Sequence, residues 1–278
     1  MEKCKLGDIC EIVSGSTPKT TIEEYWDGDV KWITPAELNE NVYIINDSVR
    51  KITKLAVEKT GLSSFPEGTV ILSTRAPIGK VAIAGCEMYC NQGFKNLICS
   101  EKIFNKYLYW FLKGNTMFLN SLGRGATFKE ISKAIVSEIE INVPEIEEQH
   151  EIVKILEKVN TIIRFRKQEL SVLDTLVKAR FVEMFGDPVS NPYGYDKVAL
   201  SDLADIKIGP FGSLLHKEDY IVGGHPLLNP SHIVDGRISP NNKLTISDEK
   251  YKELSAYQLK TGDVVMGRRG EMGRCAVV

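Results

Sequence analysis

Residues 68–83 read GTVILSTRAPIGKVAI, and two apolar runs in this stretch flank a segment that contains proline and glycine. Such runs on either side of a turn signal are typical of two β-strands joined by a tight turn. Pro77 fixes one backbone angle of that turn, and Gly79 can adopt a positive φ. The sequence therefore predicts a hairpin whose tip projects Arg75 and Lys80.

The same pattern returns 194 residues later. Residues 262–277 read GDVVMGRRGEMGRCAV, and LGDICEIVSG at 6–15 is similar to LSDLADIKIG at 200–209 with the same offset. Between these stretches, WITP at 32–35 matches LLNP at 227–230 after a slip of one residue. Because order and spacing are both preserved, we interpret the chain as two copies of one domain. The period is far too long for a stacked repeat, so each copy should have its own core.

The second copy is incomplete. Residue 278 corresponds to residue 84 of the first copy, so residues 85–144 have no counterpart. We therefore expect the chain to be truncated within its second domain, either as a fragment of a longer protein or through an interrupted gene.

A heptad pattern separates the two copies. Apolar residues and two arginines recur from Ile152 in alternating steps of four and three, which is typical of a coiled-coil seam. The seam comprises Ile152, Leu156, Val159, Ile163, Arg166, Leu170, Leu173, Val177, Arg180 and Met184. Ile155, Ile162 and Leu176 form a second apolar row, so the helix could contact two neighbours. About 40 residues at 1.5 Å per residue predict a helix of about 60 Å.

Two arginines occupy seam positions, and their role has two interpretations. The stems of Arg166 and Arg180 could lie along apolar surface while their guanidinium groups reach water. Alternatively, each could pair with a carboxylate of a partner helix and so fix the register.

Composition is that of a globular protein, with 43% hydrophobic and 26% charged residues among 278. The longest apolar runs have about six residues, far below the roughly 20 that cross a bilayer. Six cysteines are too few for a disulfide framework and the N-terminus has no apolar leader, so we expect a cytoplasmic protein.

Charge is unevenly distributed although the formal net charge is only -2. Residues 1–40 hold nine acidic and four basic residues, whereas residues 95–133 hold seven basic and two acidic residues. One face could therefore contact a polyanion, the alternative being a solvated helix face.

The sequence contains no pattern typical of a catalytic or metal site. Walker A and glycine-rich cofactor motifs are absent, and the four histidines form no HExxH motif. Cys86, Cys90 and Cys99 lack CxxC spacing, so we interpret them as buried structural thiols. We expect the chain to be non-catalytic and to hold neither metal nor cofactor.

Basic and amide side chains on predicted loops are the candidate nucleic-acid contacts. Guanidinium groups suit phosphate oxygens and the edge of guanine, and amides suit adenine. The candidates are Arg75, Lys80, Gln92, Lys95, Arg124, Thr127, Lys129, Arg268, Arg269 and Arg274. For each of these loops, stabilisation of the local turn is an equally simple explanation.

Five strings, in chain order, carry a resemblance to a known family. They are LSTRAPIGKVAI (72–83), NQGFK (91–95), GATFKEIS (125–132), PEIEEQ (144–149) and EMFGDP (183–188). Together with the duplicated domain and the heptad helix, they resemble the specificity subunit of type I restriction-modification enzymes.

The resemblance implies an α+β fold with three parts. Residues 1–144 would be a target-recognition domain, residues 145–187 a long coiled-coil helix that acts as a ruler, and residues 188–278 a partial second recognition domain of the same fold. Each recognition domain would read one half of a bipartite DNA target.

The resemblance also implies partners. Methyltransferase subunits would bind S-adenosylmethionine and modify adenine, and restriction subunits would use ATP and Mg to translocate and cleave double-stranded DNA. The chain itself would carry no cofactor, would not contact a membrane, and could self-associate through the exposed seam. The alternative from another class is a non-enzymatic coiled-coil scaffold that binds proteins.

Overall fold

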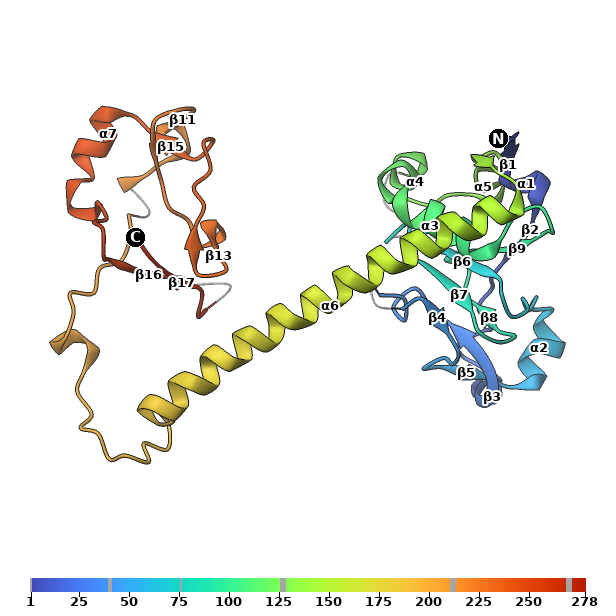
Figure 1. Cartoon of the computed structure of the whole chain (residues 1–278), viewed down its shortest axis with the longest axis horizontal. Helices are drawn as coiled ribbons and strands as arrows, with labels where there is room; N and C mark the ends of the chain where they lie inside the picture. Colours follow the sequence, from blue (N-terminus) through green and yellow to red (C-terminus); the bar gives the residue numbers. More distant parts are fainter. Residues whose placement is uncertain (1, 40–41, 76, 126–128, 211–213, 269–271) are drawn as a thin grey trace. The chain divides into compact units, whose positions relative to one another are not determined.

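The computed structural model describes residues 2–39, 42–75, 77–125, 129–210, 214–268 and 272–278. The chain divides into two compact units, Met1–Glu183 and Met184–Val278. Both contain short helices and β-strands, and a 40-residue helix belongs to the first (Figure 1). The predicted α+β class is confirmed. Within the described residues, no helix has the length and apolar character needed to cross a membrane.

The first unit, which we call unit 1, is built around a five-stranded sheet of order β2-β9-β6-β7-β4. The strands of unit 1 are β1 (Glu2–Lys5), β2 (Cys10–Ser14), β3 (Trp26–Ile33), β4 (Ile44–Ile45), β5 (Lys51–Ile52), β6 (Val70–Ser73), β7 (Val81–Ala84), β8 (Tyr89–Cys90), β9 (Phe94–Cys99) and β10 (Glu140–Val143). Strand β3 pairs with β5 and β8 in a second sheet, and β1 pairs with β10.

Both faces of the five-stranded sheet are buried. On β6, Val70 and Leu72 belong to the apolar cluster shared with the helices, whereas Ile71 belongs to the cluster on the opposite face, which includes Ile33 and Phe65. This alternation follows from the two-residue period of a strand. It explains why VIL at 70–72 is a continuous apolar run rather than an alternating one.

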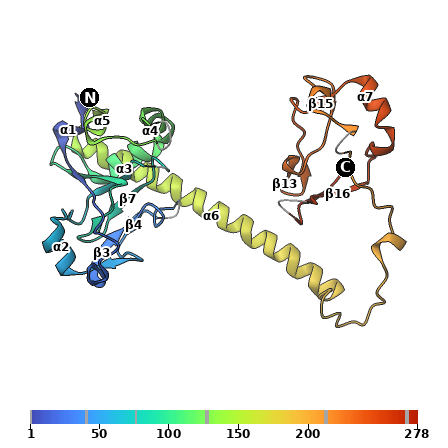
Figure 2. The same cartoon turned by 180° about the vertical axis from the view of Figure 1, so that it is seen from behind.

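Helices cover one face of this sheet. They are α1 (Leu6–Ile9), α3 (Asn105–Gly114), α4 (Thr116–Leu122) and α5 (Lys133–Ser137), with α2 (Lys54–Thr60) and the 3₁₀ turn η1 (Glu23–Tyr25) near β3. Figure 2, together with Figure 1, shows α1, α3, α4 and α5 on one side of unit 1 and α2 with β3 on the opposite side. Unit 1 therefore has a helical layer, a five-stranded sheet and a smaller sheet.

The predicted long helix is α6 (Ile146–Phe185), and its first turns pack on the rest of unit 1. The fully buried Gln149 accepts a hydrogen bond from the Phe104 N–H at 2.8 Å and donates to the carbonyls of Lys102 and Pro144 at 3.0 and 2.8 Å. Gly186, with a φ of +78°, follows the helix end, where a glycine commonly adopts this conformation.

The second unit, unit 2, is smaller and is described separately. Its strands are β11 (Tyr220–Ile221), β12 (His225–Pro226), β13 (Ile233–Val234), β14 (Arg237–Ile238), β15 (Thr245–Ile246), β16 (Val264–Met266) and β17 (Cys275–Val277). Its helices are α7 (Asp248–Glu253) and the 3₁₀ turns η2 (Leu200–Asp202), η4 (Lys217–Asp219), η5 (Pro230–His232) and η6 (Ser255–Tyr257).

The duplication inferred from the sequence extends to hydrogen-bond register. In the β6–β7 hairpin, Val70, Ile71 and Leu72 pair with Ile83, Ala82 and Val81. In β16–β17, the residues 194 positions later pair in the same way: Val264, Val265 and Met266 with Val277, Ala276 and Cys275. Gly79 and Gly273 have φ values of +91° and +93°. The two hairpins are therefore copies of one element.

The one-residue slip between the copies lies between two residues that pair with the same partner residue. Trp26 and Val30 of β3 both pair with Ile52, so three residues lie between them. Tyr220 and His225 of unit 2 both pair with Ile246, with four residues between them. One extra residue in this connection shifts the offset from 194 to 195, while the partner residues Ile52 and Ile246 keep the offset of 194.

The copies differ where β2 lies in unit 1. Residues 204–208, which the offset pairs with β2, form no strand. Strand β2 is held by antiparallel pairing with β9 along its whole length. Ile206 and Ile208 are accordingly exposed, whereas Ile12 of β2 is buried.

Candidate nucleic-acid interface

The candidate site begins at the tip of the β6–β7 hairpin. The Ser73 N–H donates to the carbonyl of Lys80 at 2.9 Å, and the Ser73 hydroxyl donates to the carbonyl of Pro77 at 2.7 Å. The Lys80 N–H in turn donates to the Ser73 hydroxyl at 2.9 Å. Ser73 therefore pairs with three polar groups of the turn, and none of these bonds uses the Arg75 or Lys80 side chain.

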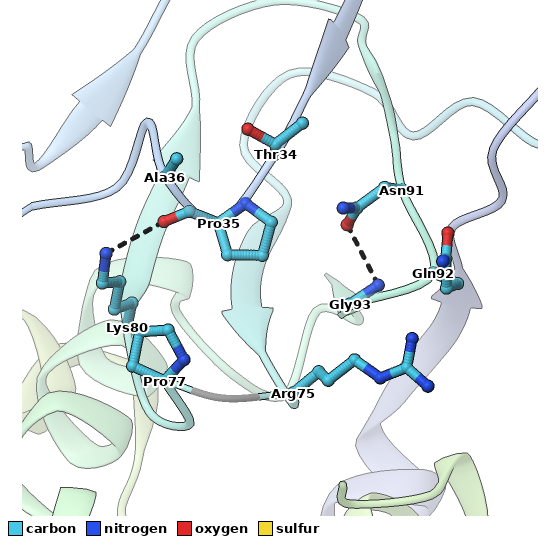
Figure 3. Close-up of a pocket in the computed structure, with 9 residues that line it drawn as sticks. All are labelled: Thr34, Pro35, Ala36, Arg75, Pro77, Lys80, Asn91, Gln92 and Gly93. Atoms are coloured by element: carbon cyan, nitrogen blue, oxygen red, sulfur yellow. Dashed lines mark hydrogen bonds between the residues drawn. The ribbon is translucent and has the colours of Figure 1, made fainter. Parts of the chain in front are cut away.

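Three of the predicted contacts, Arg75, Lys80 and Gln92, line one pocket of about 350 Å³ (Figure 3). The pocket is lined by Thr34, Pro35, Ala36, Arg75, Pro77, Lys80, Asn91, Gln92 and Gly93. These residues come from the loop after β3, the hairpin tip, and the loop between β8 and β9. Figure 3 shows Lys80 at one side of the pocket and the Arg75 side chain extending toward the side of Gln92.

Hydrogen bonds fix these loops to one another. The Thr74 N–H donates to the carbonyl of Gly93 at 2.8 Å, and the Lys80 ammonium donates to the carbonyl of Pro35 at 2.9 Å. The hydroxyl of Thr17 donates to the side-chain carbonyl of Gln92. The pocket is thus assembled from segments that are distant in sequence and held in place before any ligand binds.

Glu130 organises the basic side chains around the pocket. Its carboxylate lies 3.4 Å from the Arg75 Nε and 3.9 Å from the Lys95 Nζ. Its backbone exchanges two hydrogen bonds with Arg124, at 3.0 and 2.9 Å. The half-exposed Arg75 guanidinium is therefore oriented by an ion pair while keeping donors available to a ligand.

Lys95 occupies a different environment from the one predicted. Its side chain is only 9% exposed and its ammonium lies against Glu130 and the carbonyl of Phe94. Burial lowers the pKa of Lys95, and the negative charge of Glu130 opposes this shift. Lys95 is therefore directed inward, where it supports the loop, rather than toward the pocket.

The remaining predicted residues are dispersed. Arg124 and Lys129 are exposed beside the pocket, and Arg268 is exposed in unit 2. The Arg274 guanidinium donates to the carbonyl of Ile233 at 3.3 Å, much as Lys80 binds Pro35 in unit 1. Thr127 and Arg269 lie outside the described residues.

Sequence reasoning missed Glu130, Thr17 and the turn at Thr34. For Glu130 no local pattern signals a role, because Arg75 and Lys95 lie 55 and 35 positions away. The turn had a signal in the matched WITP and LLNP strings. The hydrogen bond that closes this turn occurs in both units. In unit 1 the Thr34 N–H donates to the Glu37 carboxylate at 2.7 Å, and in unit 2 the Asn229 N–H donates to the His232 ring at 3.3 Å.

The cysteines and acidic residues offer no metal site in the described part of the chain. Within it, no group of three or more histidine, cysteine, aspartate or glutamate side chains could hold a metal ion. Cys90 is buried, and burial raises the pKa of its thiol to about 12. Cys86 and Cys99 are half-buried free thiols.

The heptad seam is only partly exposed. Ile152 and Leu156 are half-buried and Val153, outside the seam, is buried, because the first turns of α6 pack on unit 1. From Val159 to Met184 the seam faces solvent. The guanidinium groups of Arg166 and Arg180 bind Glu169 and Glu183 of the same helix, at 2.5 and 2.7 Å.

Sequence comparisons place this architecture among known proteins. The family model described as type I restriction modification DNA specificity domain matches residues 1–175. The MjaIX specificity subunit of Methanocaldococcus jannaschii is 34% identical over 285 residues, and the match covers 93% of this chain and 66% of that protein. The EcoR124I/EcoR124II specificity subunit of Escherichia coli is 29% identical over 164 residues, covering 56% of this chain and 40% of that protein.

A structural comparison gives the same fold. A solved structure concerned with complex assembly and conformational transition of the type I R-M system aligns with a TM-score of 0.54 at 19% identity. The alignment covers 64% of this chain and 43% of that chain. The chain thus spans two thirds or less of the length of these relatives.

Removal of the Glu130 carboxylate should loosen the pocket. We expect Glu130→Gln to lower the free energy of unfolding of unit 1 by about 1–2 kcal/mol, since the buried Lys95 ammonium loses its counter-ion while water still screens part of the site. Urea denaturation followed by tryptophan fluorescence measures this, because Trp26, Trp32 and Trp110 all lie in unit 1.

Glu138→Gln is the matched control. It removes a carboxylate from the solvent-exposed pair with Lys5 and should leave the urea midpoint unchanged. Equal midpoints for the two variants would show that Glu130 does not organise the site.

Proposed function

Because the chain belongs to the type I restriction-modification DNA specificity family, we propose that it recognises double-stranded DNA through the pocket at the tip of the β6–β7 hairpin. The observation that carries the proposal is the convergence of Arg75, Lys80 and Gln92 on one pocket. Guanidinium and amide groups are the side chains that discriminate base edges in the major groove. Protein atoms already satisfy part of each side chain's hydrogen-bonding capacity, which fixes its orientation.

The basic side chains around the pocket suit contacts to the DNA phosphates, while the pocket itself would contact the bases. Arg124 and Lys129 are exposed on the neighbouring loop, where contacts to phosphate would position the duplex without reading its sequence. Lys95 would act indirectly, by holding Glu130 and through it Arg75.

The proposal extends to a bipartite target. Residues 1–144 would form one target-recognition domain, residues 145–187 the helical spacer, and residues 188–278 part of a second recognition domain. The repeated β16–β17 hairpin supports this assignment, because it presents Arg268 and Arg274 at the positions of Thr74 and Lys80.

Catalysis would belong to partner subunits. We propose that methyltransferase subunits supply S-adenosylmethionine-dependent adenine methylation, and that restriction subunits supply ATP- and Mg-dependent cleavage in the same cytoplasmic complex. The exposed part of the heptad seam on α6 supports a helical partner. Its residues Leu170, Leu173 and Val177 form a continuous apolar strip exposed to water.

Arg75→Ala should weaken or redirect sequence preference. Loss of a side chain that reads a base should lower affinity for the preferred duplex by about 1–3 kcal/mol, with a smaller effect on unrelated duplexes. The preferred duplex is first selected from a random library, and fluorescence anisotropy then measures binding between about 50 and 200 mM salt, where phosphate contacts weaken steeply. Lys59→Ala, on the exposed face of α2, is the control, and an unchanged preference in Arg75→Ala would remove this residue from the site.

Leu170→Asp should disrupt association through α6. A carboxylate in the centre of the heptad seam would be buried in the interface without a partner. Binding to the methyltransferase subunit or to a second copy should therefore be lost. Sedimentation velocity measures the complexes. Ser171→Asp places a carboxylate on the side of α6 that faces away from the heptad seam, so it should leave the complexes intact. Identical behaviour of the two variants would show that the seam is not an interface.

A further inference from the structure

The outward face of α4 is apolar, and none of the described residues of unit 1 covers it. Leu119 faces the core and is fully buried, as expected for a short helix that packs on the sheet domain. Met117, on the opposite face, is 90% exposed, and the neighbouring Phe118, between the two faces, is 45% exposed. Ser121 continues this face one turn later. Two large apolar side chains are therefore presented side by side to solvent.

The position of α4 is coupled to the hairpin tip. The Asn120 side chain donates to the carbonyl of Ile78 at 3.1 Å. Thr116 packs so closely on Gly79 that a Cβ at that position would lie 2.8 Å from the Thr116 methyl group. The apolar pair is thus held at a fixed place relative to the turn that carries Arg75 and Lys80.

The charge around α4 favours an anionic partner over a basic or neutral protein surface. The helix leads directly into Gly123 and the loop that carries Arg124 and Lys129, both exposed. The single acidic residue between residues 113 and 133 is Glu130, which is already paired with Arg75 and Lys95. Apolar side chains flanked by cations suit duplex DNA, in which a stacked apolar interior lies between two rows of phosphates.

We propose that Met117 and Phe118 insert between base pairs beside the recognised sequence and kink the duplex. Apolar wedges of this kind unstack one base step and bend the DNA, which brings more of it into contact with protein. The inference rests on the proposed DNA recognition by the hairpin pocket. It adds a contact that does not read base identity but makes recognition depend on how easily the neighbouring step deforms.

The test uses the full-length chain and its preferred duplex in two labelled forms. One form carries a donor and an acceptor dye at its ends and reports the bend by energy transfer. The other carries 2-aminopurine at successive steps beside the recognised sequence and reports unstacking by increased fluorescence. For the wild type we expect both a bend and a fluorescence increase at one step.

The double variant Met117→Ala with Phe118→Ala should reduce both signals by about half or more, while the order of preference among duplexes is kept. Phe118→Leu retains an apolar wedge and should restore most of the signal, and Ser121→Ala should behave as wild type. Circular dichroism establishes that each variant is folded.

Three outcomes are distinguishable. Failure of the wild type to bind any duplex selectively would contradict the proposed function itself. Selective binding with the same bend and fluorescence in the double variant would overturn only the wedge. Loss of self-association or of partner-subunit binding in the double variant, with the bend unchanged, would assign the α4 face to a protein and would also overturn it.

Discussion

The antiparallel register of β6 and β7 determines where the candidate contacts lie. Strand β6 is buried on both faces. A slip of one residue in its pairing would turn Ile71 toward the helices and turn Val70 and Leu72 toward the opposite face of the sheet. The same register places Ser73 opposite Lys80, and Gly79 closes the turn with a positive φ that other residues rarely adopt. The core therefore determines the position of the tip, which carries Arg75 and Lys80 into the pocket.

A few contacts between segments distant in sequence hold the parts of unit 1 together. Glu130 joins three chain segments, Lys80 holds the turn at Pro35, and Gln149 anchors α6 beside the sheet. Each contact satisfies a polar group that would otherwise be costly to bury or to leave mobile. The result is a preorganised pocket, which would lower the entropy cost of the proposed duplex binding.

Local sequence patterns predicted the strands and helices, whereas contacts between distant segments determine how the side chains of the site are oriented. The hairpin, its repeat 194 residues later and the long helix follow from periodicity and spacing, and the one-residue slip falls between two residues that share one partner residue. Nothing local could reveal that Lys95 turns inward or that Glu130 binds Arg75, because those contacts depend on segments meeting across the sheet. Likewise the heptad pattern identified one face of α6 but not that Ile152 and Leu156 are half-buried against unit 1.

The central claim is that the pocket at the hairpin tip touches the bases of DNA, and site-specific photo-cross-linking tests it most directly. Ala36 is exposed in the pocket lining beside Pro35, on the side of Lys80 (Figure 3), so a benzoylphenylalanine introduced there samples what the pocket holds. The account predicts cross-links to bases inside the preferred sequence, and none from the same probe at Lys59 on α2. Equal cross-linking from both positions, or none from position 36 while DNA binding is intact, would contradict it.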